Sequence, residues 1–206
     1  MSQILVNGEP YYTFSQADRL WLARMLIGES SDPRDWDAQL WTIAQRFVLR
    51  GKRYETTIAD LVQNFSQPIN PDWYRGGAFC APGGRFEHDA GCSESRMQRR
   101  DELREDHWTV AELRDELRAV DRFLDGRTPN PVPGATDWHA TALRAGNVRY
   151  APHLSNVFQG PPSFTTQVDI APGGIPRWVA PALGAVGFAA LVGAGVMLYR
   201  KSKRSS

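Results

Sequence analysis

One acid lies on the apolar side of a predicted helix within Leu20–Ser30, LWLARMLIGES. Leu22, Met25 and Leu26 recur at helical spacing, and Glu29 is the next position on the same stripe. A buried carboxylate loses solvation in its charged form, so its pKa rises and it can keep a proton near neutral pH. General-acid cleavage of a glycosidic bond requires such a proton. An acid at a helix end can also turn toward water, so the pattern leaves both interpretations open.

Two cysteines could do a different kind of chemistry. Cys80 and Cys92 bracket a short Gly-containing stretch, and outside the cytoplasm they could form a disulfide bond, worth about 3 kcal/mol by the chain-entropy estimate. A zinc site would recruit His88 and His107, but this spacing lacks the close pairs of common zinc sites. Free thiols are the third alternative. We predict no metal site and no cofactor.

The helix that carries the acid has clear boundary signals. Ser15 followed by Asp18 forms a capping-box pattern, which predicts a helix through about Ile27. After a turn, apolar spacing predicts a second helix over 36–49, ended by Gly51. These two helices would hold the candidate site.

The rest of the folded part is less regular. Thr57 is the expected cap of a short third helix, and 66–92 is predicted to be a long irregular connection, rich in Gly, Pro and aromatic residues. A charged helix is expected over 93–106, followed by one that opens at Thr109 and ends at Gly126.

The C-terminal part has a different composition. Residues 161–177 are predicted to be a Pro- and Gly-rich linker, and 178–199 contain no charged side chain over a length that predicts a single transmembrane helix. Small residues at four-residue spacing within it could let two such helices associate: Ala185, Ala189 and Gly193. The expected partners are therefore a lipid bilayer and a second copy of the helix.

Charge indicates the expected orientation. The tail over 200–206 is basic, which places it on the cytoplasmic side and the preceding domain on the periplasmic or extracytoplasmic side. No signal peptide is visible at the N-terminus, which conflicts with that topology unless the chain is a virion protein that enters lipid during assembly. The net charge over 206 residues is only +1, so we expect no nucleic-acid partner.

Four motifs occur in the order typical of one known family. LARMLIGES is followed by DAQLWTIAQRF with Gln45 and Arg46, then by NFSQPINP with Phe65 and Ser66, then by AVDRFLDGRTPNPVPGATDWHA. In these motifs the chain resembles the cell-wall hydrolase family that includes the spore-cortex-lytic enzymes. The resemblance covers about 16–160, within a domain expected over 1–160, and 74–107 look like an insertion.

The resemblance implies a mostly α fold with a minor β part, lysozyme-like. It implies cleavage of the β-1,4 bond between N-acetylmuramic acid and N-acetylglucosamine in peptidoglycan, usually as a lytic transglycosylase, with Glu29 as the catalytic acid. That chemistry suits a single acid, since the muramoyl 6-hydroxyl can close a 1,6-anhydro ring. A hydrolytic lysozyme would need a second carboxylate, for which the candidates are Asp32, Asp35 and Asp137.

By the same resemblance, four residues are expected to contact the glycan: Phe65, Ser66, Asp137 and His139. Each also has a plain structural interpretation, as does Trp138, which could stack on a sugar ring or pack in the core. The chain departs from the family in the turn after Glu29 and in Gln45, where the family has Asn.

Two other function classes stay open. The chain could be an inactive membrane-anchored virion or envelope protein that kept the fold and binds the wall. It could also be a small lysis accessory protein, although the organised domain argues against that interpretation. Retention of the acid favours an enzyme.

Overall fold

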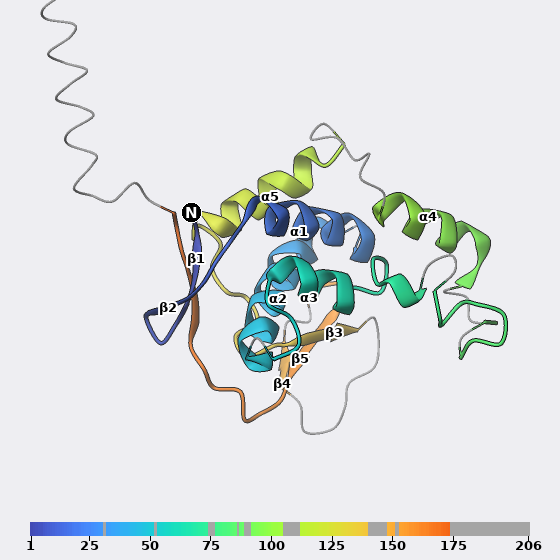
Figure 1. The fold of residues 1–206 in the computed structure, drawn as a ribbon. Coiled ribbons are helices and arrows are strands. Elements are labelled where there is room, and N and C mark those ends of the chain that lie inside the picture. Colours follow the sequence, from blue (N-terminus) through green and yellow to red (C-terminus); the bar gives the residue numbers. More distant parts are fainter. Residues whose placement is uncertain are drawn as a thin grey trace, which may run out of the picture. The chain divides into compact units, whose positions relative to one another are not determined.

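The computed structural model of this protein describes residues 1–30, 32–51, 53–73, 77–85, 87–88, 92–104, 112–139, 148–150 and 153–173. The chain divides into two compact units, Met1–Pro172 and Gly173–Ser206, and all described elements belong to the first. Figure 1 shows these elements: α1 Gln16–Glu29, α2 Trp36–Arg50, α3 Ile58–Phe65, α4 Glu94–Arg104, α5 Arg114–Leu124, the short 3-10 helices η1 Pro33–Asp35 and η2 Pro71–Trp73, and the strands β1 Gln3–Val6, β2 Glu9–Thr13, β3 Asp137–His139, β4 Val148–Tyr150, β5 Val157–Gly160 and β6 Val168–Ala171.

The core lies among four helices. Helix α1 packs against α5 and α3, and α2 packs against α3 and α5. The apolar stripes predicted from spacing are buried, and aromatic rings from different helices meet edge to face, as Trp41 and Phe123 do at 5.4 Å between ring centroids. The indole N–H of Trp41 donates to the carbonyl oxygen of Thr128 at 3.2 Å, so this buried polar group is also satisfied.

Local capping explains where the helices begin and end. The hydroxyl of Ser15 accepts from the backbone N–H of Asp18, whose carboxylate accepts from the N–H of Ser15 at 2.7 Å, which confirms the predicted capping box. Gly51 ends α2 with φ of 65°, and Thr57 caps α3, also as predicted. Helix α5 begins at Arg114, later than expected.

A hairpin at the N-terminus begins the first sheet. Asn7 and Gly8 both have positive φ, as a two-residue turn between antiparallel strands requires, and they join β1 to β2. Strand β6 pairs antiparallel with the other edge of β1, with Ile170 opposite Ile4, giving the order β2-β1-β6. The segment expected to be a linker over 161–177 therefore contains a strand, because Val168 and Ile170 alternate with polar residues and are buried.

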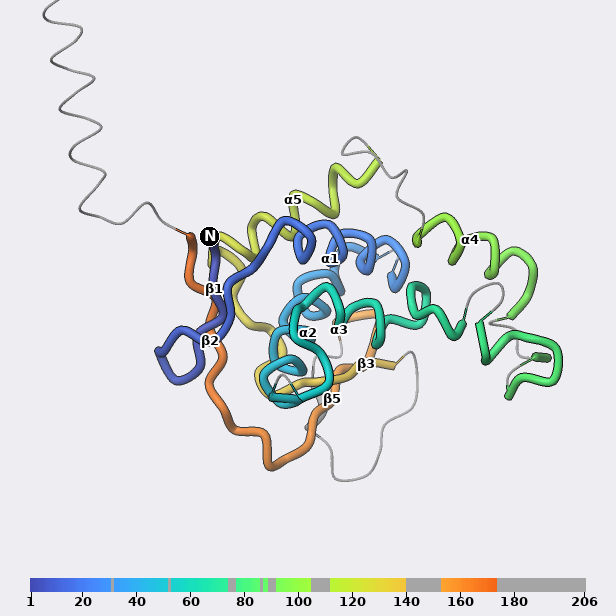
Figure 2. Tube along the Cα trace, in the orientation of Figure 1, coloured from blue at the N-terminus to red at the C-terminus, as the bar shows by residue number. Residues whose placement is uncertain are grey.

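The second sheet supports the candidate site. Strands β3, β5 and β4 are antiparallel in the order β3-β5-β4, and Trp138 lies opposite Phe158. Helix α2 packs against β3. In the tube view of Figure 2, β3 lies beside α2, so residues far apart in the sequence are brought together there.

The expected fold class is wrong. The sequence predicts a mostly helical chain with a minor β part, whereas the protein is a mixed fold of helices and two antiparallel three-stranded sheets. The strands are only three to five residues long, too short to show a periodic pattern, and β1 pairs not only with β2 but also with β6, which is distant in the sequence.

The predicted transmembrane helix is not supported. None of the helices in the described part of the chain is long and apolar enough to cross a membrane. The segment 178–199 lies outside the described residues, as do Ala185, Ala189 and Gly193.

Candidate active site

Glu29 is the last residue of α1. The helix ends there because Ser30 takes an extended conformation, while its backbone N–H still donates to the carbonyl oxygen of Leu26 at 3.2 Å. Leu22, Met25 and Leu26 are buried as the sequence predicted, and Glu29 is half-buried on the continuation of their stripe. The acid therefore stays against the protein and does not turn away into solvent.

Three hydrogen-bond donors reach the Glu29 carboxylate. The hydroxyl of Ser66, just after α3, donates to Oε1 at 2.7 Å. The indole Nε1–H of Trp138, on β3, donates to Oε2 at 3.4 Å, and the backbone N–H of Gln67 also donates to the carboxylate. The two side-chain donors lie 37 and 109 residues from Glu29 in the sequence.

Burial dominates the electrostatics of this group. Loss of solvation raises the pKa of Glu29, the hydrogen bonds from Ser66, Trp138 and Gln67 oppose that rise, and the negative charge of Asp137 adds to it. In the described part of the chain, no cationic side chain forms an ion pair with Glu29. The pKa of the Glu29 carboxyl group thus lies above its ordinary value, while three donors contact its oxygens and stabilise the charged form.

An aromatic stack holds Trp138 in place. The rings of Trp138 and Phe65 meet edge to face at 5.0 Å between centroids, and the guanidinium of Arg46 lies 3.8 Å from the centroid of Phe65. Arg46 also donates from Nη1 to the carbonyl oxygen of Thr136 at 2.9 Å. Phe65, expected to contact the glycan, therefore packs between Arg46 and Trp138 at the edge of the site.

Gln45 fixes the turn that leads into β3. Its Nε2 donates to the carbonyl oxygens of Val132 and Ala135 at 3.1 and 2.9 Å, and its Oε1 accepts from the backbone N–H of Gly134 at 2.6 Å and from Asn130. All hydrogen-bonding positions of this buried amide are used. Gln45 and Arg46 therefore act together, since each binds backbone atoms of the segment that carries Trp138.

Asp137 and His139 lie on β3, on either side of Trp138 in the sequence. They are partly exposed, and His139 Nε2 lies 3.3 Å from Asp137 Oδ2. Alternate residues of a strand share a face, so these two side chains lie on the face opposite to Trp138. Asp137 is close enough to Glu29 and Arg46 to influence the pKa of both. Among the described residues, His139 makes no hydrogen bond to Glu29.

The other two candidate second acids are engaged elsewhere. Asp32 is paired with the exposed Arg34. Asp35 is fully buried and accepts hydrogen bonds from the backbone N–H and hydroxyl of Ser155 and from Asn156 Nδ2. These contacts tie the start of α2 to the segment before β5, which is a structural role.

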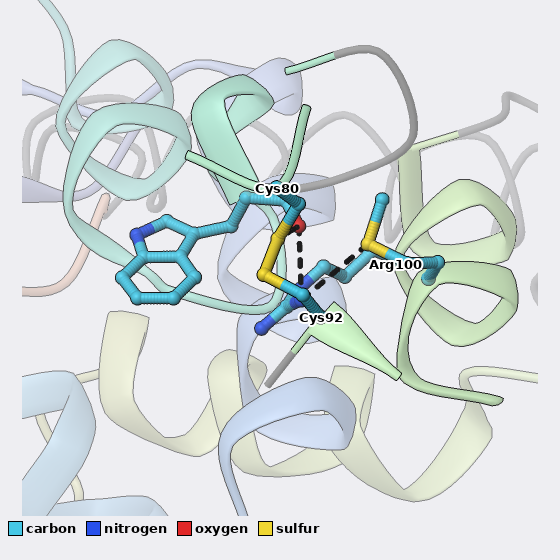
Figure 3. The surroundings of a disulfide bond; sticks show 5 residues. Cys80, Cys92 and Arg100 are labelled. Atoms are coloured by element: carbon cyan, nitrogen blue, oxygen red, sulfur yellow. Dashed lines mark hydrogen bonds between the residues drawn. A yellow bond between two sulfur atoms is a disulfide. The ribbon is translucent and has the colours of Figure 1, made fainter. Parts of the chain in front are cut away.

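A disulfide bond closes the loop that follows η2 in the sequence. Cys80 and Cys92 are joined, and Figure 3 shows Arg100 of α4 next to this bond. The guanidinium of Arg100 donates to the carbonyl oxygen of Trp73 at 2.9 Å and lies 5.4 Å from the centroid of its ring. His88 lies in this loop and His107 lies outside the described residues, and no group of metal-binding side chains occurs in the described part of the chain.

Helix α4 reaches the candidate site through a glycine. A Cβ atom placed on Gly28 would lie 2.9 Å from Cβ of Pro68 and 3.0 Å from Cδ1 of Leu103. Only glycine lets α4 and the segment after Ser66 approach the end of α1 this closely. Helix α4, which belongs to the segment expected to be an insertion, thus packs against Gly28, the residue that precedes Glu29.

The sequence indicates the acid but not all of its surroundings. Ser66 was expected to bind substrate, whereas its hydroxyl contacts Glu29 itself, and the side chain is fully buried. Trp138 was expected to stack on a sugar or pack in the core, and its hydrogen bond to the acid had no signal in the sequence. The backbone donor Gln67 could not have been found at all, because any residue type except proline supplies an N–H.

Comparisons with protein-family models, with curated proteins and with solved structures found no match for this chain.

Proposed function

We propose that this protein cleaves the β-1,4 bond between N-acetylmuramic acid and N-acetylglucosamine in peptidoglycan, with Glu29 as the general acid. The observation that carries the proposal is the state of Glu29: an acid held against the protein, without an ion pair among the described residues, and with a raised pKa. A carboxyl group that keeps its proton at working pH can deliver it to a leaving oxygen.

The donors around Glu29 support the second half of such a reaction. When the proton moves to the glycosidic oxygen and the bond to the anomeric carbon breaks, Glu29 becomes an anion. Ser66, Trp138 and the N–H of Gln67 already point at its oxygens, so they stabilise the new charge without rearrangement. A raised pKa in the free protein and donors for the anion are both features that a general acid needs.

A lytic transglycosylase needs no further acid. The Glu29 anion takes the proton of the muramoyl 6-hydroxyl, whose oxygen bonds to the anomeric carbon and closes the 1,6-anhydro ring, which returns the proton to Glu29. Asp35 and Asp32 are engaged by other partners, so Asp137 is the remaining candidate second carboxylate in a hydrolytic reaction. We favour the single-acid reaction because Glu29 has its donors in place and Asp137 lies on the opposite face of β3 from Trp138.

The disulfide bond supports a place of action outside the reducing cytoplasm. Disulfide bonds such as that between Cys80 and Cys92 persist in oxidising compartments, which is where peptidoglycan is found. The inference about the compartment does not depend on the chemistry at Glu29.

The test uses the full chain on purified peptidoglycan. We expect the parent to release soluble fragments and E29Q to lose activity by about 10²–10⁴-fold, the usual contribution of a general acid. E9Q, which changes an exposed glutamate on β2, is the matched control and should retain full activity. A parent chain that releases nothing, or an E29Q chain that releases fragments at the parental rate, contradicts the proposal.

Mass spectrometry of the fragments separates the two reactions. Anhydro-muramic ends identify transglycosylation, and reducing ends identify hydrolysis. D137N should leave transglycosylation nearly unchanged, whereas it should reduce hydrolysis strongly if Asp137 activates water.

A further inference from the structure

The first compact unit contains a cleft whose lining does not include Glu29. Its volume is about 510 Å³, within the range of small-molecule sites. One wall is the turn with Asn130, Pro133 and Gly134, the other consists of Pro162 and residues 164–169, and Gln45 also lines the cleft. We propose that this cleft binds a neutral, N-acetylated stretch of glycan that continues from the bond held at Glu29.

The cleft is built by the same contacts that position the candidate active site. Gln45 holds the first wall by its hydrogen bonds to Val132, Gly134 and Ala135. Outside the lining, a Cβ atom on Gly160 of β5 would overlap with the carbonyl oxygen of Gly134, so only glycine fits there and β5 lies close to the first wall. These contacts fix the first wall of the cleft.

The lining fits an uncharged sugar better than a charged ligand. Pro133, Pro162 and Phe164 provide apolar surface on which the carbon–hydrogen face of a sugar ring can pack. Asp169 is the only charged side chain among the described residues that line the cleft, and Gln167 Nε2 already donates to it at 2.8 Å.

The polar side chains of the cleft can accept hydrogen bonds, and its two threonine hydroxyls can also donate them. The amides of Gln45 and Asn130 are used within the turn, which leaves the hydroxyls of Thr165 and Thr166, with the oxygens of Gln167 and Asp169, for a ligand. Hydroxyl and acetamido N–H groups of an amino sugar are complementary donors. The described lining thus matches the chemistry of a glycan and presents no cationic side chain to an anionic ligand.

The cleft is connected to the surroundings of Glu29 through β3, because Trp138 of this strand donates to the Glu29 carboxylate. The first wall continues into β3, which carries Trp138, and β5 continues into the second wall, as Figure 2 lets the reader follow. Gly134 and Trp138 are four positions apart, so their backbones lie no more than about 13 Å from each other. A glycan strand is long enough to occupy both places at once. The identity of this polymer rests on the proposed function.

The experiment measures binding apart from turnover. In the full chain carrying E29Q, the probes are a β-1,4-linked N-acetylglucosamine oligosaccharide, followed by calorimetry, and insoluble peptidoglycan, followed by sedimentation. Adding T166Y, which fills the cleft, should weaken oligosaccharide binding at least tenfold. Adding S163Y, an exposed position in the same segment that does not line the cleft, is the matched control and should leave binding unchanged.

Q167A is the second variant, for the case that T166Y does not fold. It removes an acceptor at an exposed position and should weaken binding severalfold. Equal binding by E29Q, E29Q/T166Y and E29Q/Q167A would overturn the inference, as would binding of free stem peptide in place of the oligosaccharide.

The two proposals fail in different ways. If the parent chain releases no fragments but oligosaccharide binding is lost in T166Y, the proposed function is wrong and the binding site stands. If the parent cleaves peptidoglycan and T166Y changes neither binding nor turnover, the binding site is wrong and the proposed function stands.

Discussion

Helix α1 carries a carboxylate near each of its ends, and the two have different surroundings. Asp18, in the first turn, is fully buried and accepts four hydrogen bonds, from Tyr12, from the backbone and hydroxyl of Ser15, and from the backbone N–H of Ala59. The positive end of the helix dipole also favours its charge. Asp18 is therefore a structural carboxylate that joins β2, α1 and α3.

Glu29 occupies the opposite end of the same helix. The negative end of the dipole disfavours its charge, one of its side-chain donors is 3.4 Å away, and the residue keeps part of its surface exposed. The comparison teaches that burial alone does not identify a reactive acid. A buried acid with a full set of donors is structural, whereas one with fewer donors at an unfavourable helix end can keep a proton and use it.

The largest expected effect tests the structural end. D18A leaves the hydroxyl of Tyr12 and the backbone N–H groups of Ser15 and Ala59 without the acceptor that Asp18 provides. We expect the free energy of unfolding to fall by about 3 kcal/mol or more, since each orphaned buried donor costs about 1–3 kcal/mol. Urea unfolding followed by circular dichroism measures this.

The matched control for D18A is D115N. Asp115 is an exposed acid of α5 that forms an ion pair with Arg118 of the same helix. D115N should therefore change the free energy of unfolding by no more than about 0.5 kcal/mol. Equal losses in D18A and D115N would show that Asp18 does not hold the three elements together.

The second effect has the opposite sign, at the other end of the helix. Because the pKa of Glu29 is raised in the folded protein, the native state binds a proton that the unfolded state has released, and stability falls as pH rises through that interval. E29Q cannot titrate. It should therefore be more stable than the parent at neutral pH, by about 1.4 kcal/mol for each pH unit by which the pKa is raised.

The pH dependence makes this result specific. The difference between E29Q and the parent should disappear below about pH 4, the ordinary range of a glutamic acid, because both side chains are then neutral in both states. Thermal unfolding between pH 4 and 8 measures it. A parent that is as stable as E29Q at every pH would mean that Glu29 titrates normally and that the two ends of α1 do not differ.

The two ends of α1 also differ in how far the sequence could predict them. The start of α1 follows from Ser15 and Asp18, and the end of α2 from Gly51, because capping depends on residues three or four positions apart. The Asn7–Gly8 dipeptide carried an equally local signal for a hairpin, which periodicity missed because the flanking strands have only four and five residues.

The surroundings of Glu29 could not be predicted in the same way. Its donors Ser66 and Trp138 are brought to it by contacts across the chain, and one of the elements that carries them is a three-residue strand. Strand β6 was missed for the same reason, since its partner is β1 at the other end of the domain. Glu29 could be predicted because it interrupts an apolar helical stripe, whereas no sequence pattern relates Ser66 or Trp138 to Glu29.

The next effect concerns the shorter of the two side-chain hydrogen bonds to Glu29. The hydroxyl of Ser66 stabilises the charged form of Glu29, so S66A should raise the pKa of Glu29 further. If Glu29 acts as an acid, the rate falls where it loses its proton, and this alkaline limb of the pH–rate profile should move to higher pH by up to about one unit. The rate below that limb should fall severalfold, because the anion loses a donor.

S155A is the matched control for S66A. It also removes a serine hydroxyl from a buried carboxylate, but from Asp35, so it should lower stability and leave the alkaline limb where it is. If the alkaline limb moved in S155A, or did not move in S66A, the pH–rate profile would report the titration of a group other than Glu29.

The smallest effect is expected at Trp138. W138F removes the indole N–H but keeps an aromatic ring that can pack against Phe65 and Phe158. The lost hydrogen bond is 3.4 Å long, compared with 2.7 Å for Ser66, so the alkaline limb should move in the same direction as in S66A but by less. Parallel pH–rate profiles of the two variants give the ranking. A larger displacement in W138F would mean that Trp138, and not Ser66, is the principal partner of the Glu29 anion. The hydrogen bond from Trp138 would then tighten when charge develops on Glu29, so its length in the free protein would not report its strength.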